Sequence, residues 1–382
     1  MANEQANNGG GRFRVGIVGS YGGLNHGDEA ILQSIITQLR AEIPVDITVF
    51  SRNPEDTRQR HKVEKAVAVR DMTKDEVIPE IEGLDLLIVG GGGILFDSEA
   101  HIFLREAVLA QNLGVPVLVY AVSAGPLKSE RARTLVKDTL TRAAIVSVRE
   151  RTAQKLLEEI GVSREIHLTA DPALLLEPEP LPEDALTKEG IVEGKRYVGL
   201  SVREPGPAAP DMDKDHYHSL LANTADFIVE RYDAEVVFVP METRNLDVQH
   251  SHAIIAQMAH AQRATVLKGD YRSAQVLTLM KHFEFAVGMR LHFLIFAAIQ
   301  NVPFVALPYA GKVSGFLDDL QISSPPMEQV NPGRLIAYID RSWDQRREIQ
   351  DHIRRFLPPI QERARETNRL VLNLLRTPAA AR

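Results

Sequence analysis

Residues 84–93, LDLLIVGGGG, form an apolar run that ends in four consecutive glycines. Two further apolar runs, FRVGIVGS (13–20) and VPVLVYAVS (115–123), precede segments whose apolar residues recur at helical spacing. Continuous apolar strands that alternate with amphipathic helices are typical of a parallel sheet covered by helices on both faces. The pattern therefore predicts an α/β fold with a doubly wound, Rossmann-like sheet.

The same alternation starts again after a stretch rich in proline and acidic residues, LLLEPEPLPEDALTKEGIVEGKR (174–196). Strand patterns at YVGLSVRE (197–204), AEVVFVP (234–240) and FEFAVGMR (283–290) alternate with helical patterns there. We therefore predict two Rossmann-like domains that face a central cleft. Ligands of such domains bind beyond the carboxyl ends of the strands.

The composition of each segment predicts where the domains begin and end. We expect a disordered leader over residues 1–12, an N-terminal domain on the acceptor side over 13–176, a linker over 177–196, a C-terminal domain on the donor side over 197–340, and basic helices, broken at LPPI, over 341–382.

The overall composition is that of an ordinary soluble globular protein, with 44% hydrophobic and 25% charged residues. Because cysteine is absent, the sequence excludes disulfides and thiolate chemistry and fits a reducing compartment. The first residues contain no apolar signal segment, and no apolar run has the length of a membrane span. We therefore expect a cytoplasmic location.

The net charge of −7 argues against a nucleic-acid partner. Residues 341–382 nevertheless contain ten Arg and no Lys against five acidic residues. This basic segment either makes peripheral contact with the inner face of the membrane or forms a solvated helix face with ion pairs, and the second explanation is favoured. The sequence is compatible with a homo-oligomer and identifies no interface.

The first glycine-rich turn is GSYGGLNHGDEAIL (19–32). It lacks the dinucleotide-binding spacing, and Asp28 and Glu29 stand where a phosphate-binding loop needs Lys and Ser or Thr. Asp28 is expected to cap the following helix. We expect Asn25 and His26 to protrude into the cleft, where His26 either acts as a general acid or base, donates to a substrate hydroxyl, or packs locally.

The second turn is GGGGILFDS (90–98). Four consecutive glycines are entropically costly, so either the first helix or a ligand is expected to pass close to the backbone at Gly91 and Gly92. Asp97 either binds a sugar hydroxyl or caps the next helix.

Arg290 and His292 lie in GMRLHFLIFAA (288–298), between an apolar strand and a helix. Anions bind at this position in α/β proteins, and a guanidinium offers a fork for carboxylate or phosphate. Arg203 lies at the corresponding end of the first strand of the same domain. Two arginines indicate a substrate with more than one negative charge, whereas the alternative for Arg290 is an ion pair with a buried carboxylate.

These motifs together resemble the polysaccharide pyruvyl transferase family. The resemblance rests on NHGDEAIL, GGGGILFDS, SVRERT with ADPALLL, GLSVRE, and GMRLHFLIFAA followed by PFVALPYAGKVSGFL, in the family's order from Val15 to about Leu320. It implies a GT-B-like fold and the transfer of pyruvate from phosphoenolpyruvate to a sugar of a polysaccharide or its precursor. The reaction forms a ketal, releases phosphate and needs neither cofactor nor metal.

The resemblance implies that Arg203, Arg290, Leu291 and His292 contact phosphoenolpyruvate, and Lys312 is expected to help hold its phosphate. We expect His292 to protonate the methylene carbon of the donor.

On the acceptor side we expect His26 or Asp28 to act as the base. The residues expected to contact the saccharide, whether or not it is lipid-linked, are Asn25, Gly91, Gly92 and Asp97. Family members often carry an acidic residue just before the lysine of the last motif, where this sequence has Ala310 and Gly311.

Two other functions remain open at this point. One is a GT-B-like glycosyltransferase that uses a nucleotide-sugar, although no acidic residue is clearly placed for a ribose. The other is a non-catalytic carbohydrate-binding relative, which the altered turn at Ala310 and Gly311 favours and the arginines and His292 oppose.

Two smaller patterns are a set of histidine pairs and an aspartate that precedes a proline. The pairs His216-x-His218 and His250-x-His252 fall in loop or helix contexts where residues two apart diverge, so we expect no metal site. Asp171 either reaches the cleft or caps the turn before Pro172, and the turn is slightly favoured.

Overall fold

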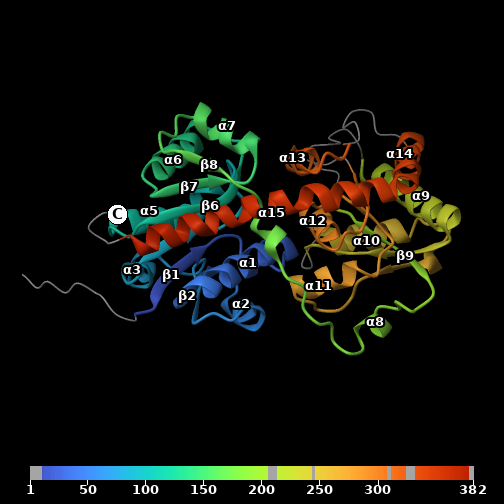
Figure 1. Ribbon diagram of the computed structural model, residues 1–382, viewed down its shortest axis with the longest axis horizontal. Helices are drawn as coiled ribbons and strands as arrows, with labels where there is room; N and C mark the ends of the chain where they lie inside the picture. The colour runs from blue at the N-terminus through green and yellow to red at the C-terminus, as the bar shows by residue number, and fades with distance from the viewer. Residues whose placement is uncertain (1–10, 205–212, 243–245, 308–310, 324–331, 378–382) are drawn as a thin grey trace, which may run out of the picture.

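The computed structural model describes residues 11–204, 213–242, 246–307, 311–323 and 332–377. It contains two parallel sheets, each with helices packed around it, placed next to each other along the long axis of the molecule (Figure 1). The prediction of an α/β fold with two Rossmann-like halves is confirmed.

The N-terminal sheet has the strand order β3-β2-β1-β4-β6-β7-β8, with β5 paired to β6, and every pairing is parallel. Its strands are β1 (Phe13–Val18), β2 (Val45–Ser51), β3 (Lys65–Ala68), β4 (Leu86–Val89), β5 (Gly92–Leu95), β6 (Val117–Ala124), β7 (Ile145–Val148) and β8 (Ile166–Leu168). Its helices are α1 (His26–Glu42), α2 (Pro54–Arg60), α3 (Lys74–Glu82), α4 (Ala100–Phe103), α5 (Arg105–Asn112), α6 (Glu130–Thr141) and α7 (Arg151–Glu159).

A short 3-10 helix, η1 (Pro172–Leu175), and α8 (Ala185–Lys188) connect the halves. The C-terminal sheet follows, with the parallel order β11-β10-β9-β12-β13. Its strands are β9 (Arg196–Ser201), β10 (Ala234–Phe238), β11 (Ala264–Val266), β12 (Phe285–Gly288) and β13 (Phe304–Ala306). Its helical segments are α9 (Lys214–Tyr232), α10 (Leu246–Ile255), η3 (Ala261–Arg263), α11 (Ser273–Met280), α12 (Leu291–Ile299), α13 (Gly311–Asp319), α14 (Pro332–Asp344) and α15 (Arg346–Arg376).

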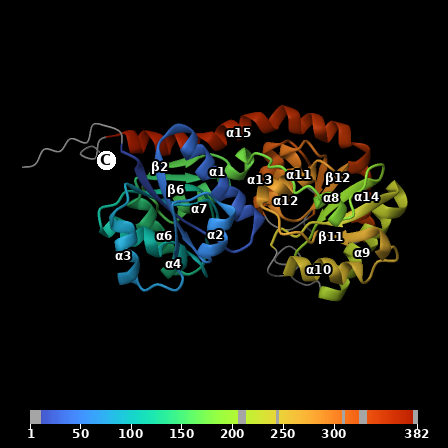
Figure 2. The ribbon, with the colours of Figure 1, turned by 90° about the horizontal axis from the view of Figure 1, so that it is seen from below.

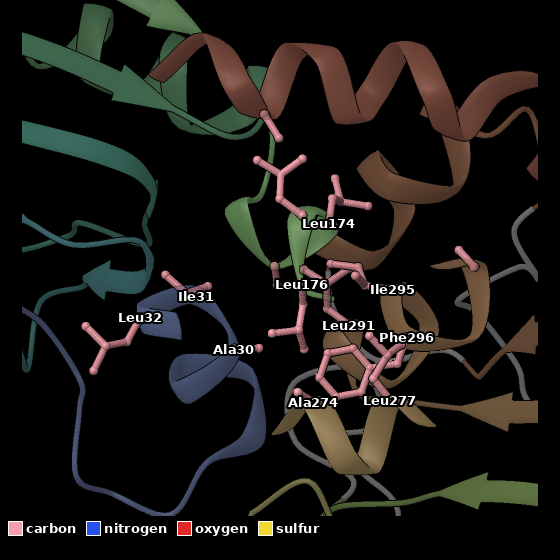
Figure 3. Packing of buried hydrophobic residues seen from close by; sticks show 14 of the residues in the cluster. Ala30, Ile31, Leu32, Leu174, Leu176, Ala274, Leu277, Leu291, Ile295 and Phe296 are labelled. Carbon is pink, nitrogen blue, oxygen red and sulfur yellow. The ribbon is translucent and has the colours of Figure 1, made fainter. Parts of the chain in front are cut away.

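One apolar cluster crosses from the N-terminal to the C-terminal half (Figure 3). Leu174 and Leu176, from the η1 segment, lie between Ile31 of α1 and the residues of α12 that include Leu291 and Ile295. All five side chains are buried or nearly so. Burial of apolar area is the main favourable term in folding, so this cluster stabilises the relative position of the two halves.

Helix α15 differs from the prediction of two helices broken at LPPI. It is one helix of 31 residues that continues through Pro358 and Pro359. A proline inside a helix costs about 3 kcal/mol, but burial of Leu357 and Ile360 on either side keeps this segment packed on the core. Figure 2 shows α15 running in a shallow curve along both halves of the molecule.

The exposed face of α15 carries ion pairs between neighbouring turns. Arg354 pairs with Asp351 at 2.6 Å, and Arg365 and Arg369 both pair with Glu362. These are the intrahelical ion pairs that the sequence analysis expected of a solvated helix face, and peripheral membrane contact stays a prediction. Within the described ranges, no helix is both long enough and apolar enough to cross a bilayer.

Candidate active site

A cavity of about 130 Å³ lies between the carboxyl ends of the two sheets and is lined by residues of both halves. We call it the cationic cavity, because four positively charged residues line it: Arg149, Arg203, Arg290 and Lys312. Asp28 and His292 also line it. A space of this size with converging charges suits a small anion.

His292 lies in the first turn of α12 and packs against the backbone of α1 in the opposite half. A Cβ atom placed on Gly27 would lie 1.9 Å from Nδ1 of His292, so only glycine at this position admits the ring. Nε2 of His292 lies 3.4 Å from Oδ2 of Asp171. The imidazole is therefore held between a glycine on one side and a carboxylate on the other.

Asp171 is supported in turn by Arg149, which the sequence analysis did not identify. Nη1 of Arg149 lies 2.5 Å from Oδ2 of Asp171, and its Nε donates to Oγ of Ser123 at 2.7 Å. Oδ1 of Asp171 accepts from the backbone N–H of Ala173 at 2.9 Å. Asp171 therefore caps η1, as the turn alternative had it, and it also contacts His292, which lines the cationic cavity.

The charge of Asp171 follows from these contacts. Burial by itself raises the pKa of the Asp171 carboxyl, but Arg149 and His292 lower it further, to well below its usual value. Asp171 is therefore ionised at neutral pH, and it places a negative charge beside His292.

Arg290 forms the ion pair that the sequence analysis considered as the alternative to substrate contact. Its Nε lies 3.0 Å and its Nη2 2.5 Å from the carboxylate of Asp247, which is fully buried. Nη2 also lies 3.0 Å from Oε2 of Glu242. Arg290 lines the cavity, but two carboxylates already compensate its charge.

Asp247 connects Arg290 to the backbone segment that contacts the start of α1. Its Oδ2 also accepts from the backbone N–H groups of Met241 and Glu242, both at 3.2 Å. The carbonyl oxygen of Met241 accepts from the backbone N–H of His26 at 2.8 Å. Arg290 and Asp247 thus fix the segment through which the C-terminal half meets the start of α1.

Lys312 and Arg203 supply charge from the C-terminal half. Burial, together with the neighbouring Arg149 and Arg203, lowers the pKa of Lys312 to about 8, although Asp28 opposes the shift. Arg203 follows β9 and pairs with Glu204. Lys312 therefore titrates close to neutral pH and is sensitive to any anion that binds beside it.

The start of α1 differs from the prediction. Asn25, and not Asp28, caps the helix, because its Oδ1 accepts from the N–H groups of Gly27 at 2.9 Å and Asp28 at 3.4 Å. Asp28 does not cap the helix and lines the cavity instead. Asn25 also lines the cavity, as expected. Burial raises the pKa of the Asp28 carboxyl, against the opposing influence of His292.

His26 does not protrude into the cleft, and this part of the prediction is wrong. The structure buries the ring with Nδ1 3.5 Å from Oγ of Ser273 on α11. Burial, with a smaller contribution from Arg60, lowers the pKa of His26 to about 4. The local packing that was the alternative for His26 is what the structure has, because the capping Asn25 turns the next side chain toward α11.

The glycine turn is occupied by protein atoms. A Cβ on Gly91 would lie 3.0 Å from Cγ2 of Ile31, and one on Gly92 would lie 3.2 Å from Oδ1 of Asp28. Gly92 also has a φ of +95°, which favours glycine. Of the two explanations for these glycines, the structure therefore shows the close approach of helix α1.

Asp97 is engaged in local structure. Its carboxylate accepts from the backbone N–H groups of Lys128 at 2.9 Å and Ser129 at 3.0 Å, just before α6. The hydrogen bond from Ser129, followed by that from Lys128, lowers the pKa of Asp97 although burial opposes this. Ser129 caps α6, and Asp97 holds the turn that precedes this cap, so Asp97 does not cap the helix that follows it in sequence.

The remaining expectations concern the altered turn and metal binding. Ala310 lies outside the described residues, and Gly311 begins α13. His218 Nε2 lies 2.7 Å from Nδ1 of His250, across α9 and α10. In the part of the chain that the structure describes, no three His, Cys, Asp or Glu residues are grouped to hold a metal ion.

Arg149 could have been found from the sequence. It stands in SVRE (147–150) at the end of an apolar strand, as Arg203 stands in SVRE (201–204). Glu242 and Asp247 had no such signal, because both are distant in sequence from the arginine that they bind.

The chain is similar in sequence to known proteins over most of its length. The family model described as polysaccharide pyruvyl transferase matches residues 25–311. The amylovoran biosynthesis protein AmsJ of Erwinia amylovora is 20% identical over 395 residues, with 90% of this chain and 95% of AmsJ covered.

Solved structures show the same fold. A UDP-GlcNAc 2-epimerase from Neisseria meningitidis has a TM-score of 0.64 at 11% identity, covering 95% of this chain and all of the epimerase. A glycosyltransferase from Rickettsia africae has a TM-score of 0.65 at 10% identity, covering 96% of this chain and 100% of that one. At such identities the likeness shows the GT-B-like fold alone.

Proposed function

The chain belongs to the polysaccharide pyruvyl transferase family, and on that premise we propose that it moves pyruvate from phosphoenolpyruvate to a saccharide acceptor. The family and the amylovoran relative support a transferase of polysaccharide biosynthesis. The observation that carries the donor assignment is the cationic cavity, where Arg149, Arg203 and Lys312 surround a small space beside His292. Phosphoenolpyruvate carries a carboxylate and a phosphate, which match these charges.

The two guanidiniums that bind the donor in this proposal are Arg149 and Arg203. Arg149 and Arg290 each pair with two carboxylates, so charge compensation does not distinguish them. The proposal prefers Arg149 because it also contacts Asp171, which lies beside His292. Arg290, the expected partner of Arg203, holds the wall of the cavity in this proposal through Asp247. Lys312, with a pKa of about 8, is mostly protonated at neutral pH and adds a third cation.

His292 supplies the proton in the first step. It transfers this proton to the methylene carbon of phosphoenolpyruvate, and the adjacent carbon becomes an oxocarbenium ion stabilised by its phosphate oxygen. Asp171, 3.4 Å from Nε2, orients the imidazole for the transfer. The carbon–carbon double bond becomes a single bond, and the methylene group becomes a methyl group.

A hydroxyl of the acceptor then adds to the cationic carbon, and its proton passes to Asp28. Burial raises the pKa of Asp28, which makes its carboxylate a stronger base than an exposed one. A second hydroxyl on the same sugar replaces the phosphate and closes the ketal, and its proton leaves with the phosphate. The proton on Asp28 returns to His292 through solvent, so two hydroxyl protons end as one methyl hydrogen and one phosphate proton.

The experiment compares phosphoenolpyruvate with a nucleotide-sugar as stabilising ligands of the full chain. We expect phosphoenolpyruvate to raise the melting temperature, by the equivalent of about 2.7 kcal/mol at a hundred times its Kd, and UDP-GlcNAc to have no effect. The reverse result would favour a glycosyltransferase and contradict the proposal.

The role of His292 is tested in the same preparation. His292→Ala is expected to retain stabilisation by phosphoenolpyruvate while acceptor-dependent phosphate release, measured with a polysaccharide fraction, falls by about 10²- to 10⁴-fold. His101→Ala removes an exposed histidine of α4 outside the cavity and is the matched control. Undiminished turnover in His292→Ala would remove the proton donor from the mechanism.

A further inference from the structure

A second cavity of about 360 Å³ adjoins the cationic cavity. Arg149, Leu291 and Lys312 line both, so the two spaces share a wall. Small-molecule sites usually have volumes of roughly 300–1,000 Å³, and this cavity falls in that range. The donor assigned above occupies the smaller space, which leaves the larger one for a second substrate.

The lining of the larger cavity combines apolar surface with hydroxyl and carboxylate groups. Phe316, Ile295 and Leu174 provide the apolar side. Thr152 of α7, together with Ser314 and Asp318 of α13, provides hydrogen-bonding groups from both halves of the molecule. A pyranose presents C–H groups on its faces and hydroxyls around its edge, so it needs a lining of this mixed kind.

Gly315 keeps this cavity open. It lies in the interior of α13, where glycine costs about 0.5–1 kcal/mol relative to alanine. A Cβ atom on Gly315 would meet no other atom within 4 Å. Packing therefore does not require glycine here, and what its missing side chain provides is room in the cavity that it lines.

We propose that the larger cavity binds the saccharide acceptor, with a diol directed past Arg149 and Lys312 toward the donor. We call it the acceptor cavity, and its assignment rests on the proposed function. Of the acceptor contacts expected from the sequence, Gly91 packs against Ile31 and Asp97 accepts from backbone N–H groups before α6, whereas Asn25 lines the cationic cavity.

The test fills the acceptor cavity with a larger side chain at Gly315, where a Cβ atom would meet no other atom within 4 Å. Gly315→Trp places an indole in the acceptor cavity, and Gly315→Ala at the same position is the matched control that preserves the helix. The probes are methyl β-D-galactopyranoside, methyl β-D-glucopyranoside and methyl α-D-mannopyranoside, whose binding to the full chain is followed by saturation-transfer NMR. Phosphoenolpyruvate binding is followed by thermal shift in the same samples.

We expect at least one glycoside to bind the unchanged chain and Gly315→Ala equally, and to bind Gly315→Trp about tenfold more weakly. Stabilisation by phosphoenolpyruvate should be the same in all three. Glycoside binding that Gly315→Trp leaves intact, or no glycoside binding to the unchanged chain, overturns the acceptor cavity alone. Loss of phosphoenolpyruvate binding in Gly315→Trp assigns the larger cavity to the donor and overturns it as well. Absence of phosphoenolpyruvate binding in the unchanged chain contradicts the proposed function itself.

Discussion

The tetrapeptide Ser-Val-Arg-Glu occurs once in each half of the molecule. The arginine of each copy lines the cationic cavity, but the two arginines differ in the residues that hold them. Arg149 follows β7 and is 3% exposed. It pairs with the next residue, Glu150, and has Asp171 and Ser123 as further partners from other strands and turns. Arg203 follows β9 and is 17% exposed, and its ion pair is with the next residue, Glu204.

The difference shows what a short motif determines and what it does not. In both halves the motif brings an arginine to the carboxyl end of a parallel strand, where ligands bind. Whether that arginine is rigidly held depends on residues elsewhere in the chain. We infer that Arg149 is part of the supporting structure as well as the site, because its side chain is almost fully buried and holds the buried carboxylate of Asp171. The side chain of Arg203 is more exposed, and its partner Glu204 keeps contact with solvent.

Replacement of Arg149 should have the largest effect. In Arg149→Met the carboxylate of Asp171, 6% exposed, loses its main partner, and we expect the free energy of unfolding in urea to fall by about 3–5 kcal/mol. The double variant Arg149→Met with Asp171→Asn removes the unpaired charge and should recover part of that loss, while phosphoenolpyruvate binding stays weak. If Arg149→Met were as stable as the unchanged chain, Arg149 would not be a structural support, and the proposed difference between Arg149 and Arg203 would be wrong.

Replacement of Arg203 should weaken ligand binding with less damage to stability. Arg203→Met leaves Glu204, which is 29% exposed and can be hydrated when it loses its partner. We expect the Kd for phosphoenolpyruvate, measured by calorimetry, to rise about tenfold, or ~1.4 kcal/mol. The fall in unfolding free energy should be less than half of that for Arg149→Met. Equal losses of stability would show that the two copies are supported alike.

The smallest expected effect is the pH dependence that Lys312 gives to the shared site. Its pKa of about 8 means that it loses its charge as the pH rises from 7 to 9, so phosphoenolpyruvate should bind up to about tenfold more weakly at pH 9. The stability of the ligand-free chain should change in the opposite direction, because between pH 8 and the unfolded pKa only the unfolded chain binds this proton.

The control for this dependence is Lys312→Arg, which keeps its charge throughout the range. We expect its affinity for phosphoenolpyruvate to be flat between pH 7 and 9. A wild-type affinity that is equally flat would contradict the role of Lys312 in holding the donor.

The sequence predicted the fold class because the buried strands are long apolar runs that end in glycine or arginine. It did not predict α2, β3 and α3, since KAVA (65–68) is a short run and the flanking helices are mostly polar. It also placed a break at Pro358 and Pro359, where packing of the neighbouring residues outweighs the local preference of proline. Local propensity failed where tertiary contacts decide the outcome.

The sequence predicted most of the residues that line the cavity, but it did not predict what each of them does there. Asn25, Asp28, Arg203, Leu291, His292 and Lys312 all line the cavity. The partners of Arg290 lie 43 and 48 positions away in sequence, so no local pattern connects them. The fit of His292 against Gly27 depends on contact between two halves, which a pattern within either half does not contain.

Helix α15 supports the cationic cavity without lining it. It packs against η1, whose first turn is capped by Asp171, and Asp171 in turn lies beside His292. None of the residues Arg346–Arg376 is among those that line the cationic cavity. A substitution on the buried face of α15 should therefore disturb the position of the Asp171 carboxylate while every residue that lines the cavity stays unchanged.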